Sequence, residues 1–527
     1  MTADLLLTNA HVLTLNPQQP MAEAVAVSGE TILAVGNSTD LQTLSGPLTQ
    51  VIDCQGQTLL PGFVDAHCHL LALASSLTGV DCGEETVKSI GDLKRVIREQ
   101  AGQTPPGEWI RGYGYDDLSL QEKRHPTRWD LDEATSNHPV RLNHRSGHAT
   151  VLNSQALALA GVGRDTPDPV NGVIHRELHT GNPTGVFFEM SGFLRERLDT
   201  DRGQRDQGIS KMNQKLLECG ITSVQDAGPN NDLARWGVFR DLVDSGRLVS
   251  RVTMMAGASH LAEFAAATMA WGFGDHRLRL GHAKIMLTLT TGDLHPSLPE
   301  LKDLVSNCHR GGFPVAVHAV ENEAVIAAAT VLGDCPVSPD SREYPALCDR
   351  IEHCSECPPS GLGLLQNSGA MVVTQPGFIY WNGDRYLSGV APELLPYLYP
   401  IDSWLNAGVS VAFGSDAPVI DPNPWPGIYA AVTGDTRLGA RFPKPKGASR
   451  KRGVSVLAAL RMYTIGGACA EGTQQIKGSI EPGKLADLVL VDADPTRLAN
   501  SALKDIKTML TVVGGKVAWR RSLSGQD

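Results

Sequence analysis

Eight short apolar segments alternate with helical patterns along the middle of this chain, and this alternation constrains the fold more than any other feature. The segments lie at residues 63–66, 221–226, 251–255, 282–287, 314–318, 350–353, 370–374 and 409–416. Short buried strands that are separated by helices form parallel βα units. Eight such units predict an α/β fold, a (β/α)8 TIM barrel that occupies residues 61–471.

The interval between the first two segments is too long for a simple βα connection. We therefore expect an insertion at about residues 80–190 that forms a lid over the barrel mouth. In a barrel of this kind, differences between the loops at the mouth set what the site accepts.

Both ends of the chain read as short strands with turn signals. Alternating apolar residues occur at 4–14, 24–27 and 32–36, and again at 485–492 and 508–517, where Gly514-Gly515 predicts a hairpin. These patterns predict one small β-sandwich that is built from residues 1–60 together with residues 472–527. The two termini would then lie close in space.

Composition and charge exclude several classes of partner. A formal net charge of -11 and a pI near 5.8 argue against nucleic acid and against an anionic membrane surface. The sequence shows neither a signal-peptide pattern nor an apolar run long enough to cross a bilayer, so we expect a cytoplasmic protein. Ten cysteines without framework spacing fit reduced thiols. The single C-x-x-C of Cys354 and Cys357 is weak evidence for a redox or zinc role.

The first predicted strand is followed by His67 and His69, whose side chains should leave its end on the same side. Imidazole nitrogen suits zinc and similar divalent ions. Other candidate ligands occur in or at the ends of later strands: Lys284, His318, His353 and Asp416.

Each of these residues has a structural interpretation when it is taken alone. A histidine can be a hydrogen-bonded core residue, Lys284 a buried ion-pair partner, and Asp416 a helix cap. Because the carboxyl ends of all barrel strands meet at one face, the six residues together predict a metal site there.

These motifs resemble those of the amidohydrolase superfamily, and most closely the branch that contains N-substituted formamide deformylases. The resemblance covers nearly the whole chain. It rests on residues 60–69 (LPGFVDAHCH), 350–353 (RIEH), 414–418 (GSDAP) and 478–488, on the insertion motifs at 146–148, 153–157 and 183–186, and on residues 459–464.

The resemblance implies a binuclear metal site. His67 and His69 would bind the more buried ion together with Asp416, and His318 and His353 would bind the second. Lys284 would bridge the two ions after CO2 has carboxylated its amine. One or two divalent ions are expected, with zinc favoured.

The resemblance also implies a hydrolase that acts on a small amide-type molecule: an amide, N-substituted formamide, carbamate or cyclic amide. Water activated by the metal would attack the carbonyl, and Asp416 would move the proton to the leaving nitrogen. His148 is expected either to contact the substrate or to make a structural hydrogen bond within the lid. The family also implies a homodimer.

One departure from the branch leaves an alternative open. Members often carry Gly-Asp three and four residues after the strand-five histidine, where this chain has Glu321 and Asn322. A Glu at that spacing shuttles protons in mononuclear deaminases of the superfamily. A one-metal aminohydrolase would use His67, His69, His318 and Asp416 as ligands, Glu321 as shuttle and His353 as a donor on the oxyanion side. Lys284 argues against this alternative because one ion needs no bridging ligand.

A metal-binding regulator without activity is a third interpretation. It would predict at least one missing ligand, and none of the six positions is missing.

Overall fold

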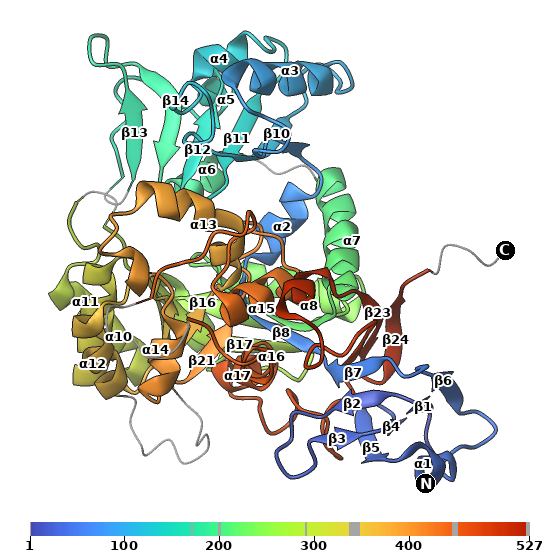
Figure 1. Ribbon diagram of the computed structural model, residues 1–527. Coiled ribbons are helices and arrows are strands. Elements are labelled where there is room, and N and C mark those ends of the chain that lie inside the picture. Colours follow the sequence, from blue (N-terminus) through green and yellow to red (C-terminus); the bar gives the residue numbers. More distant parts are fainter. Residues whose placement is uncertain are drawn as a thin grey trace. The chain divides into compact units, whose positions relative to one another are not determined.

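The structure is a computed structural model of the 527-residue chain (Figure 1). It describes residues 2–169, 172–198, 202–289, 292–336, 348–444 and 452–522. The chain divides into two compact units, one made of Met1–His69 and Asn213–Asp527 and the other of Leu70–Met212. The insertion expected at about 80–190 falls within the second unit, and its boundaries stay a prediction.

A parallel eight-stranded sheet forms the centre of the first unit. Its strand order is β21-β20-β19-β18-β17-β16-β15-β8. The strands are β8 (Phe63–Cys68), β15 (Ile221–Asp226), β16 (Arg251–Gly257), β17 (Leu278–Met286), β18 (Val315–Ala319), β19 (Arg350–His353), β20 (Met371–Thr374) and β21 (Val411–Phe413). All eight expected strands are present, and the TIM-barrel prediction is confirmed.

Helices lie between these strands in the sequence, and three more described helices follow the last of them. They are α7 (Arg202–Glu218), α8 (Leu233–Asp244), α9 (Leu261–Ala266), α10 (Leu298–Arg310), α11 (Asn322–Asp334), α12 (Pro359–Ser368), α13 (Gly377–Gly389), α14 (Ile401–Asn406), α15 (Pro424–Thr433), α16 (Val456–Met462) and α17 (Ile465–Ala470). Within the described part of the chain, no helix has the length and apolar character needed to span a membrane.

Parallel ladders join each barrel strand to its neighbour from β8 round to β21, but no ladder is formed between β21 and β8. Individual hydrogen bonds cross this seam instead. The backbone N–H of Asp416 donates to His67 O at 2.7 Å, and the N–H of Ser415 donates to the Asp65 carboxylate at 2.9 Å. The barrel therefore closes beside His67 and Asp416.

Strands from both ends of the chain form two further sheets. One has the order β5 (Thr31–Gly36), β4 (Ala24–Ser28), β1 (Leu5–Thr8), β6 (Gln50–Asp53). The other has the order β24 (Lys516–Arg520), β23 (Thr508–Val513), β22 (Leu488–Val491), β7 (Thr58–Pro61), β2 (His11–Leu13), β3 (Met21–Ala22). The helix α1 (Ser38–Gln42) follows β5.

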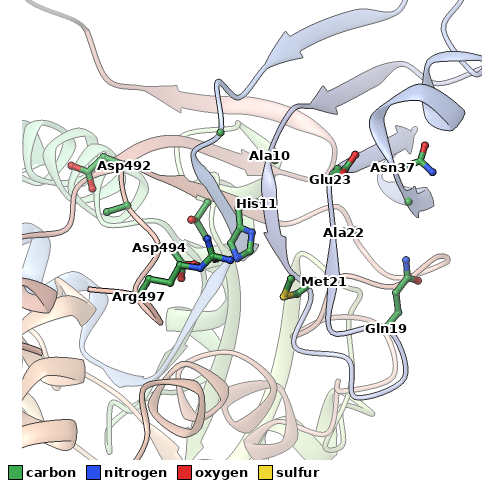
Figure 2. A pocket seen from close by; sticks show the side chains of 14 residues that line it. Ala10, His11, Gln19, Met21, Ala22, Glu23, Asn37, Asp492, Asp494 and Arg497 are labelled. Carbon is green, nitrogen blue, oxygen red and sulfur yellow. Dashed lines mark ion pairs between the residues drawn. The ribbon is translucent and has the colours of Figure 1, made fainter. Parts of the chain in front are cut away.

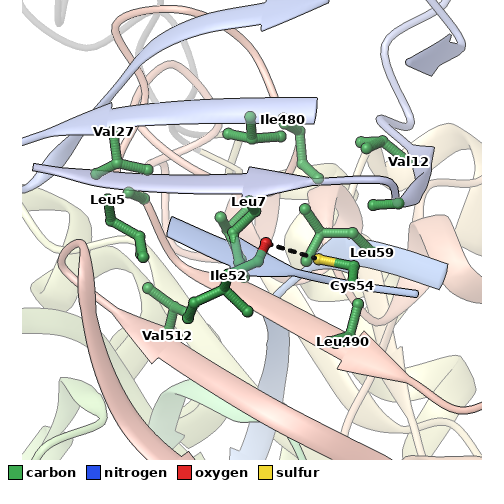
Figure 3. Close-up of a cluster of buried hydrophobic side chains, with 14 of the residues drawn as sticks. Leu5, Leu7, Val12, Val27, Ile52, Cys54, Leu59, Ile480, Leu490 and Val512 are labelled. Atoms are coloured by element: carbon green, nitrogen blue, oxygen red, sulfur yellow. Dashed lines mark hydrogen bonds between the residues drawn. The ribbon is translucent and has the colours of Figure 1, made fainter. Parts of the chain in front are cut away.

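One hydrophobic core joins these two sheets (Figure 3). Alternate residues Leu5 and Leu7 of β1 meet Leu490 of β22 and Val512 of β23 in the same cluster. β7 pairs antiparallel with β22, so segments more than 400 residues apart are hydrogen-bonded neighbours. Both glycines of the expected hairpin, Gly514 and Gly515, have positive φ, as a tight two-residue hairpin turn requires.

The second unit is built on a six-stranded sheet with the order β13-β14-β12-β11-β10-β9. The strands are β9 (Val80–Asp81), β10 (Ile110–Tyr115), β11 (Val140–His144), β12 (Ala149–Leu152), β13 (Val173–Arg176) and β14 (Pro183–Phe188). Its helices are α2 (Leu70–Ser76), α3 (Ile90–Ala101), α4 (Arg128–Asp132), α5 (Ser154–Leu159) and α6 (Ser191–Arg197). The buried faces of α3 and the sheet make a separate core that includes Leu93, Ile97 and Leu142.

Candidate metal centre

Three of the predicted ligands meet at the seam of the barrel. His67 lies in β8, His69 follows that strand, and Asp416 follows β21. One ligand atom from each lies within 4.8 Å of the others. Asp416 Oδ1 is 3.5 Å from His67 Nε2 and 3.1 Å from His69 Nε2. Zinc bonds of about 2.1 Å at tetrahedral angles place ligand atoms about 3.4 Å apart, so these separations suit one ion.

His67 is prepared for ligation by the partner of its other ring nitrogen. Its Nδ1–H donates to the Glu352 carboxylate, which also accepts from the Arg350 guanidinium at 2.8 Å. The opposite nitrogen, Nε2, is buried and has no hydrogen-bond partner. A buried unsatisfied nitrogen carries a free-energy cost unless something binds it. The residues present therefore fit a divalent metal ion.

His353 is likewise held at Nδ1. It ends β19, and its Nδ1 lies 2.8 Å from Gln375 Oε1. The His353 ring centroid is 4.5 Å from that of His318 and 4.8 Å from that of His67. His318, in β18, is 7% exposed. The structure thus places His318 and His353 together beside the group made by His67, His69 and Asp416.

Lys284 is buried in β17, and its charge acts on the same residues. The pKa of His67 lies well below its usual value, mainly because the ring is buried and secondly because of the positive charge of Lys284. Burial also lowers the pKa of Lys284 itself to about 8, although the carboxylates of Glu352 and Asp416 act in the opposite direction. Lys284 therefore sits among the predicted ligands with a weakened hold on its proton.

Asp416 carries a carboxylate that stays ionised in a buried position. Burial alone raises its pKa, but the hydrogen bond from His69 and the charges of His353, His67 and His69 hold that pKa below the usual range. Asp416 and His353 both have left-handed backbones, with φ of 58° and 68°. Such strain in non-glycine residues concentrates at functional sites.

Two further predicted residues are Glu321 and His148. Glu321 is the N-cap residue of α11. Burial raises the pKa of the Glu356 carboxyl, and the negative charges of Glu321 and Glu323 also raise it. His148 belongs to the second unit, where its Nδ1 is 2.8 Å from Glu189 Oε1. The role of each stays a prediction.

The supporting residues Glu352 and Gln375 were not identified as such from the sequence. Glu352 precedes His353 by one residue, so strand alternation points its side chain to the opposite side from that histidine. Its contact with His67 is visible only in the structure. Gln375 follows β20 directly. Its position at the carboxyl end of a barrel strand was the one sequence signal that could have marked it as a site residue.

A separate hollow of about 920 Å³ lies at the edge of the terminal β-sandwich (Figure 2). Asp494 is at its edge, with its carboxylate 3.1 Å from His11 Nε2 and 3.1 Å from Arg497 Nε. None of the predicted ligands lines it.

The sequence profile of the Amidohydrolase family matches residues 50–518. The chain belongs to this family. The N-substituted formamide deformylase of Arthrobacter pascens is 30% identical to this amidohydrolase, over 98% of the chain and 99% of the deformylase.

Solved structures share the fold. An uncharacterized metal-dependent hydrolase from Pyrococcus horikoshii OT3 is 22% identical with a TM-score of 0.73, over 94% of this chain and 99% of its own. Atrazine chlorohydrolase TrzN from Arthrobacter aurescens TC1, complexed with zinc, is 15% identical with a TM-score of 0.54. The match covers 99% of this chain and 97% of the chlorohydrolase chain. The amidohydrolase is thus a metal-dependent enzyme that hydrolyses carbon–nitrogen bonds other than peptide bonds.

Proposed function

We propose that this amidohydrolase hydrolyses the amide-type bond of a small molecule, with N-substituted formamides as the first substrate class to test. The observation that carries the proposal is the group of buried His67 and Asp416 with part-exposed His69 at the barrel seam. A relative that matches over 99% of its own length is an N-substituted formamide deformylase, which supports that substrate class over other amides, carbamates and cyclic amides.

In this proposal the ligands divide as the family resemblance implies. His67, His69 and Asp416 would hold one ion, His318 and His353 would hold a second, and Lys284, once carboxylated, would supply a further carboxylate to them. Zinc is the ion we favour, since imidazole and carboxylate donors suit it. When bound, the ions lower the pKa of water and polarise a carbonyl oxygen.

Asp416 has the charge that the proton transfer needs. A carboxylate held ionised by neighbouring histidines can accept the proton of the attacking water and then deliver it to the leaving nitrogen. Collapse of the tetrahedral adduct breaks the carbon–nitrogen bond and releases an amine and a carboxylic acid, which is formic acid for a formamide. Asp416→Asn should lower kcat by at least about 100-fold, the usual size of a lost proton transfer.

The lowered pKa of Lys284 supports its carboxylation. The free amine attacks CO2 to give a carbamate and one proton, so the reaction needs unprotonated lysine. A pKa of about 8 leaves about one lysine in ten unprotonated at pH 7, against about one in three thousand at the ordinary value of 10.5.

Metal-free protein that is reconstituted with Zn²⁺ should therefore recover more activity and more bound zinc with added bicarbonate than without it. The Lys284→Met variant should show no bicarbonate effect. Equal recovery of wild-type protein in both buffers would argue against the carbamate.

The one-metal deaminase remains an alternative that the Glu321→Gln variant tests. The proposal predicts a change of less than about tenfold in kcat, because Glu321 takes no part in the proton transfer assigned to Asp416. Glu323→Gln, an exposed neighbour in the first turn of α11, is the matched control. A loss of several orders of magnitude at Glu321 alone, with metal content intact, would favour the deaminase.

A substrate panel separates the same two functions directly. N-aryl and N-alkyl formamides, matching acetamides and carbamates, and amino-substituted heterocycles should be compared by kcat/KM with zinc-loaded enzyme. We expect the formamides to lead. Turnover confined to the heterocycles, with release of ammonia, would replace the proposal by the deaminase.

We further propose that the enzyme works as a homodimer in the cytoplasm. The expectation rests on the family resemblance for the dimer and on ten free thiols for the reducing compartment. Light scattering coupled to gel filtration of the full chain should give twice the monomer mass of 56.3 kDa. A mass of one chain at micromolar concentration would refute the dimer.

A further inference from the structure

The 70–212 unit contains a second group of side chains of the types that bind metals, apart from the group at the barrel seam. They lie at the ends of two strands of its sheet. β10 and β11 are parallel neighbours, and Tyr115 at the end of β10 pairs with His144 at the end of β11. Asp116 and Asp117 follow Tyr115 directly. The carboxyl ends of two parallel strands therefore bring two carboxylates and one imidazole to the same edge of this sheet.

The separations match those at the barrel seam. His144 Nε2 is 3.2 Å from Asp117 Oδ1 and 3.8 Å from Asp116 Oδ1. Ligand atoms of the three residues all lie within 4.8 Å of one another, as they do for His67, His69 and Asp416. Tetrahedral zinc needs about 3.4 Å between neighbouring donors, so small shifts would complete the shell.

His144 Nε2 points to an occupant of this group. The side chain is 10% exposed, and Nε2 is buried with no hydrogen-bond partner although two carboxylates face it. A nitrogen lone pair directed at carboxylate oxygens is repelled, and an N–H there would be expected to donate to one of them. A cation between the nitrogen and the oxygens removes both problems.

The surrounding residues hold the donors in position. His144 Nδ1 is 2.8 Å from Ser146 Oγ, and it accepts from the Ser146 backbone N–H at 3.1 Å. Ligation through Nε2 requires the proton on Nδ1, where it would donate to the Ser146 hydroxyl in place of the contact with the backbone N–H. Without an ion, Nδ1 keeps the backbone hydrogen bond and a proton on Nε2 faces Asp117.

The charges also favour a divalent cation. Asp116, which is buried, accepts from Arg145 at Oδ2 at 3.2 Å, which offsets one of the two carboxylate charges, while Asp117 is partly exposed and keeps its charge beside His144. His125 turns its Nε2 toward Asp117 at 3.8 Å while its Nδ1 is 3.0 Å from the Tyr115 hydroxyl. A neutral imidazole anchored at one nitrogen is the form in which histidine ligates metals.

We propose that Asp116, Asp117 and His144 form a second divalent metal site, within the 70–212 unit, with His125 as a fourth ligand. Nitrogen and carboxylate donors suit zinc and manganese. This site is separate from the barrel group and does not rest on the proposed activity.

The test is zinc stoichiometry in the full chain. Chelator-treated protein is reloaded with Zn²⁺ alone, freed of excess by gel filtration, and analysed by mass spectrometry for zinc per chain. Asp117→Asn and His144→Gln should each retain one zinc fewer per chain than wild type after gel filtration. The reason is that the affinity of this site for zinc should fall by at least about 100-fold. Asp165→Asn, an exposed aspartate of the same unit, should bind as wild type does.

Asp416→Asn separates this proposal from the proposed function. If that variant loses zinc while Asp117→Asn and His144→Gln keep the wild-type count, the barrel site stands and the second site is refuted. If Asp117→Asn and His144→Gln lose an ion and Asp416→Asn does not, the second site stands and the barrel assignment is refuted.

A second measurement needs no variant. Wild-type protein treated with Fe²⁺, ascorbate and oxygen should be oxidised at histidines that hold the iron, and peptide mass mapping should find the added oxygen on His144 or His125. Prior loading with Zn²⁺ should suppress it. Absence of oxidation at both histidines, with oxidation of the barrel histidines present, would overturn the proposal and leave a proton between His144 and Asp117.

Discussion

At the scale of single residues, the barrel site depends on which ring nitrogen each histidine has free. Glu352 holds Nδ1 of His67 and Gln375 faces Nδ1 of His353, so both rings can present Nε2 to an ion. Partners of this kind orient a metal-binding imidazole and raise its basicity. The carboxylate of Glu352 is itself fixed by both nitrogens of the Arg350 fork.

Replacement of Glu352 by Gln should therefore weaken zinc binding without removing a ligand. The expected loss is about 10- to 100-fold in affinity, because the neutral amide accepts more weakly from His67 Nδ1–H. Competition with a chromophoric chelator measures it. Glu356→Gln, three residues beyond the proposed ligand His353, is the matched control and should leave affinity within about twofold. Equal affinities for the two variants would refute the role of Glu352.

At the scale of elements, the seam between β8 and β21 decides how closely the ligands approach. Gly414 lies against this seam: a Cβ there would meet His67 N at 2.6 Å and His67 O at 3.0 Å. Backbone atoms cannot move aside as a flexible side chain can. The absence of a side chain at Gly414 is what allows Asp416 to lie beside His67.

Gly414→Ala should consequently open the seam. We expect a loss of about 1–3 kcal/mol in the free energy of unfolding, typical of overpacking in a tight core, together with weaker zinc binding. Gly389→Ala is the control, since a Cβ at that helix end meets no atom within 4 Å. Thermal melts with and without Zn²⁺ measure both effects. A variant as stable as wild type, with unchanged zinc affinity, would contradict the constraint.

At the scale of the whole molecule, a buried ion pair connects barrel strands to the segment that leads into the terminal sandwich. Lys477 pairs with Glu471 and donates to Ser223 in β15 at 2.8 Å, while Thr253 in β16 donates to Glu471. Although burial acts to raise the pKa of Glu471, the charge and hydrogen bond of Lys477 lower it below the usual value.

The pH dependence of stability follows from that depressed pKa. A carboxylate with a lowered folded-state pKa contributes stability above its unfolded pKa of about 4.5, and loses it as pH falls through the folded value. Glu471→Gln should cost about 3 kcal/mol at pH 7, because Lys477 stays buried without its counter-charge. The difference from wild type should shrink below about pH 4.5.

Urea unfolding of the two proteins between pH 4 and 7 tests this expectation. Glu481→Gln removes a more exposed pair with Lys484 and should cost less than about 1 kcal/mol. If the Glu471–Lys477 pair supplied no stability, Glu471→Gln and Glu481→Gln would lose the same small free energy of unfolding at every pH.

Local sequence patterns were enough to predict the barrel, and they led to a prediction of where its site lies. Eight apolar segments predicted eight parallel strands, and parallel strands must share one carboxyl edge, so His67, His318 and His353 could be placed at one face without coordinates. The same reasoning joined residues 1–60 to 472–527. These conclusions follow from local patterns and from the chirality and direction of βα units.

Which side chains lie within ligand distance could be seen only in the folded molecule. The seam that joins Asp416 to His67, the anchoring of His67 by Glu352, and the group of Asp117 and His144 all connect residues far apart in the chain. No spacing rule relates residue 117 to residue 144, although each follows or ends an apolar run. Their meeting depends on which strands become neighbours in the sheet, and that is set by packing over the whole unit rather than by local pattern.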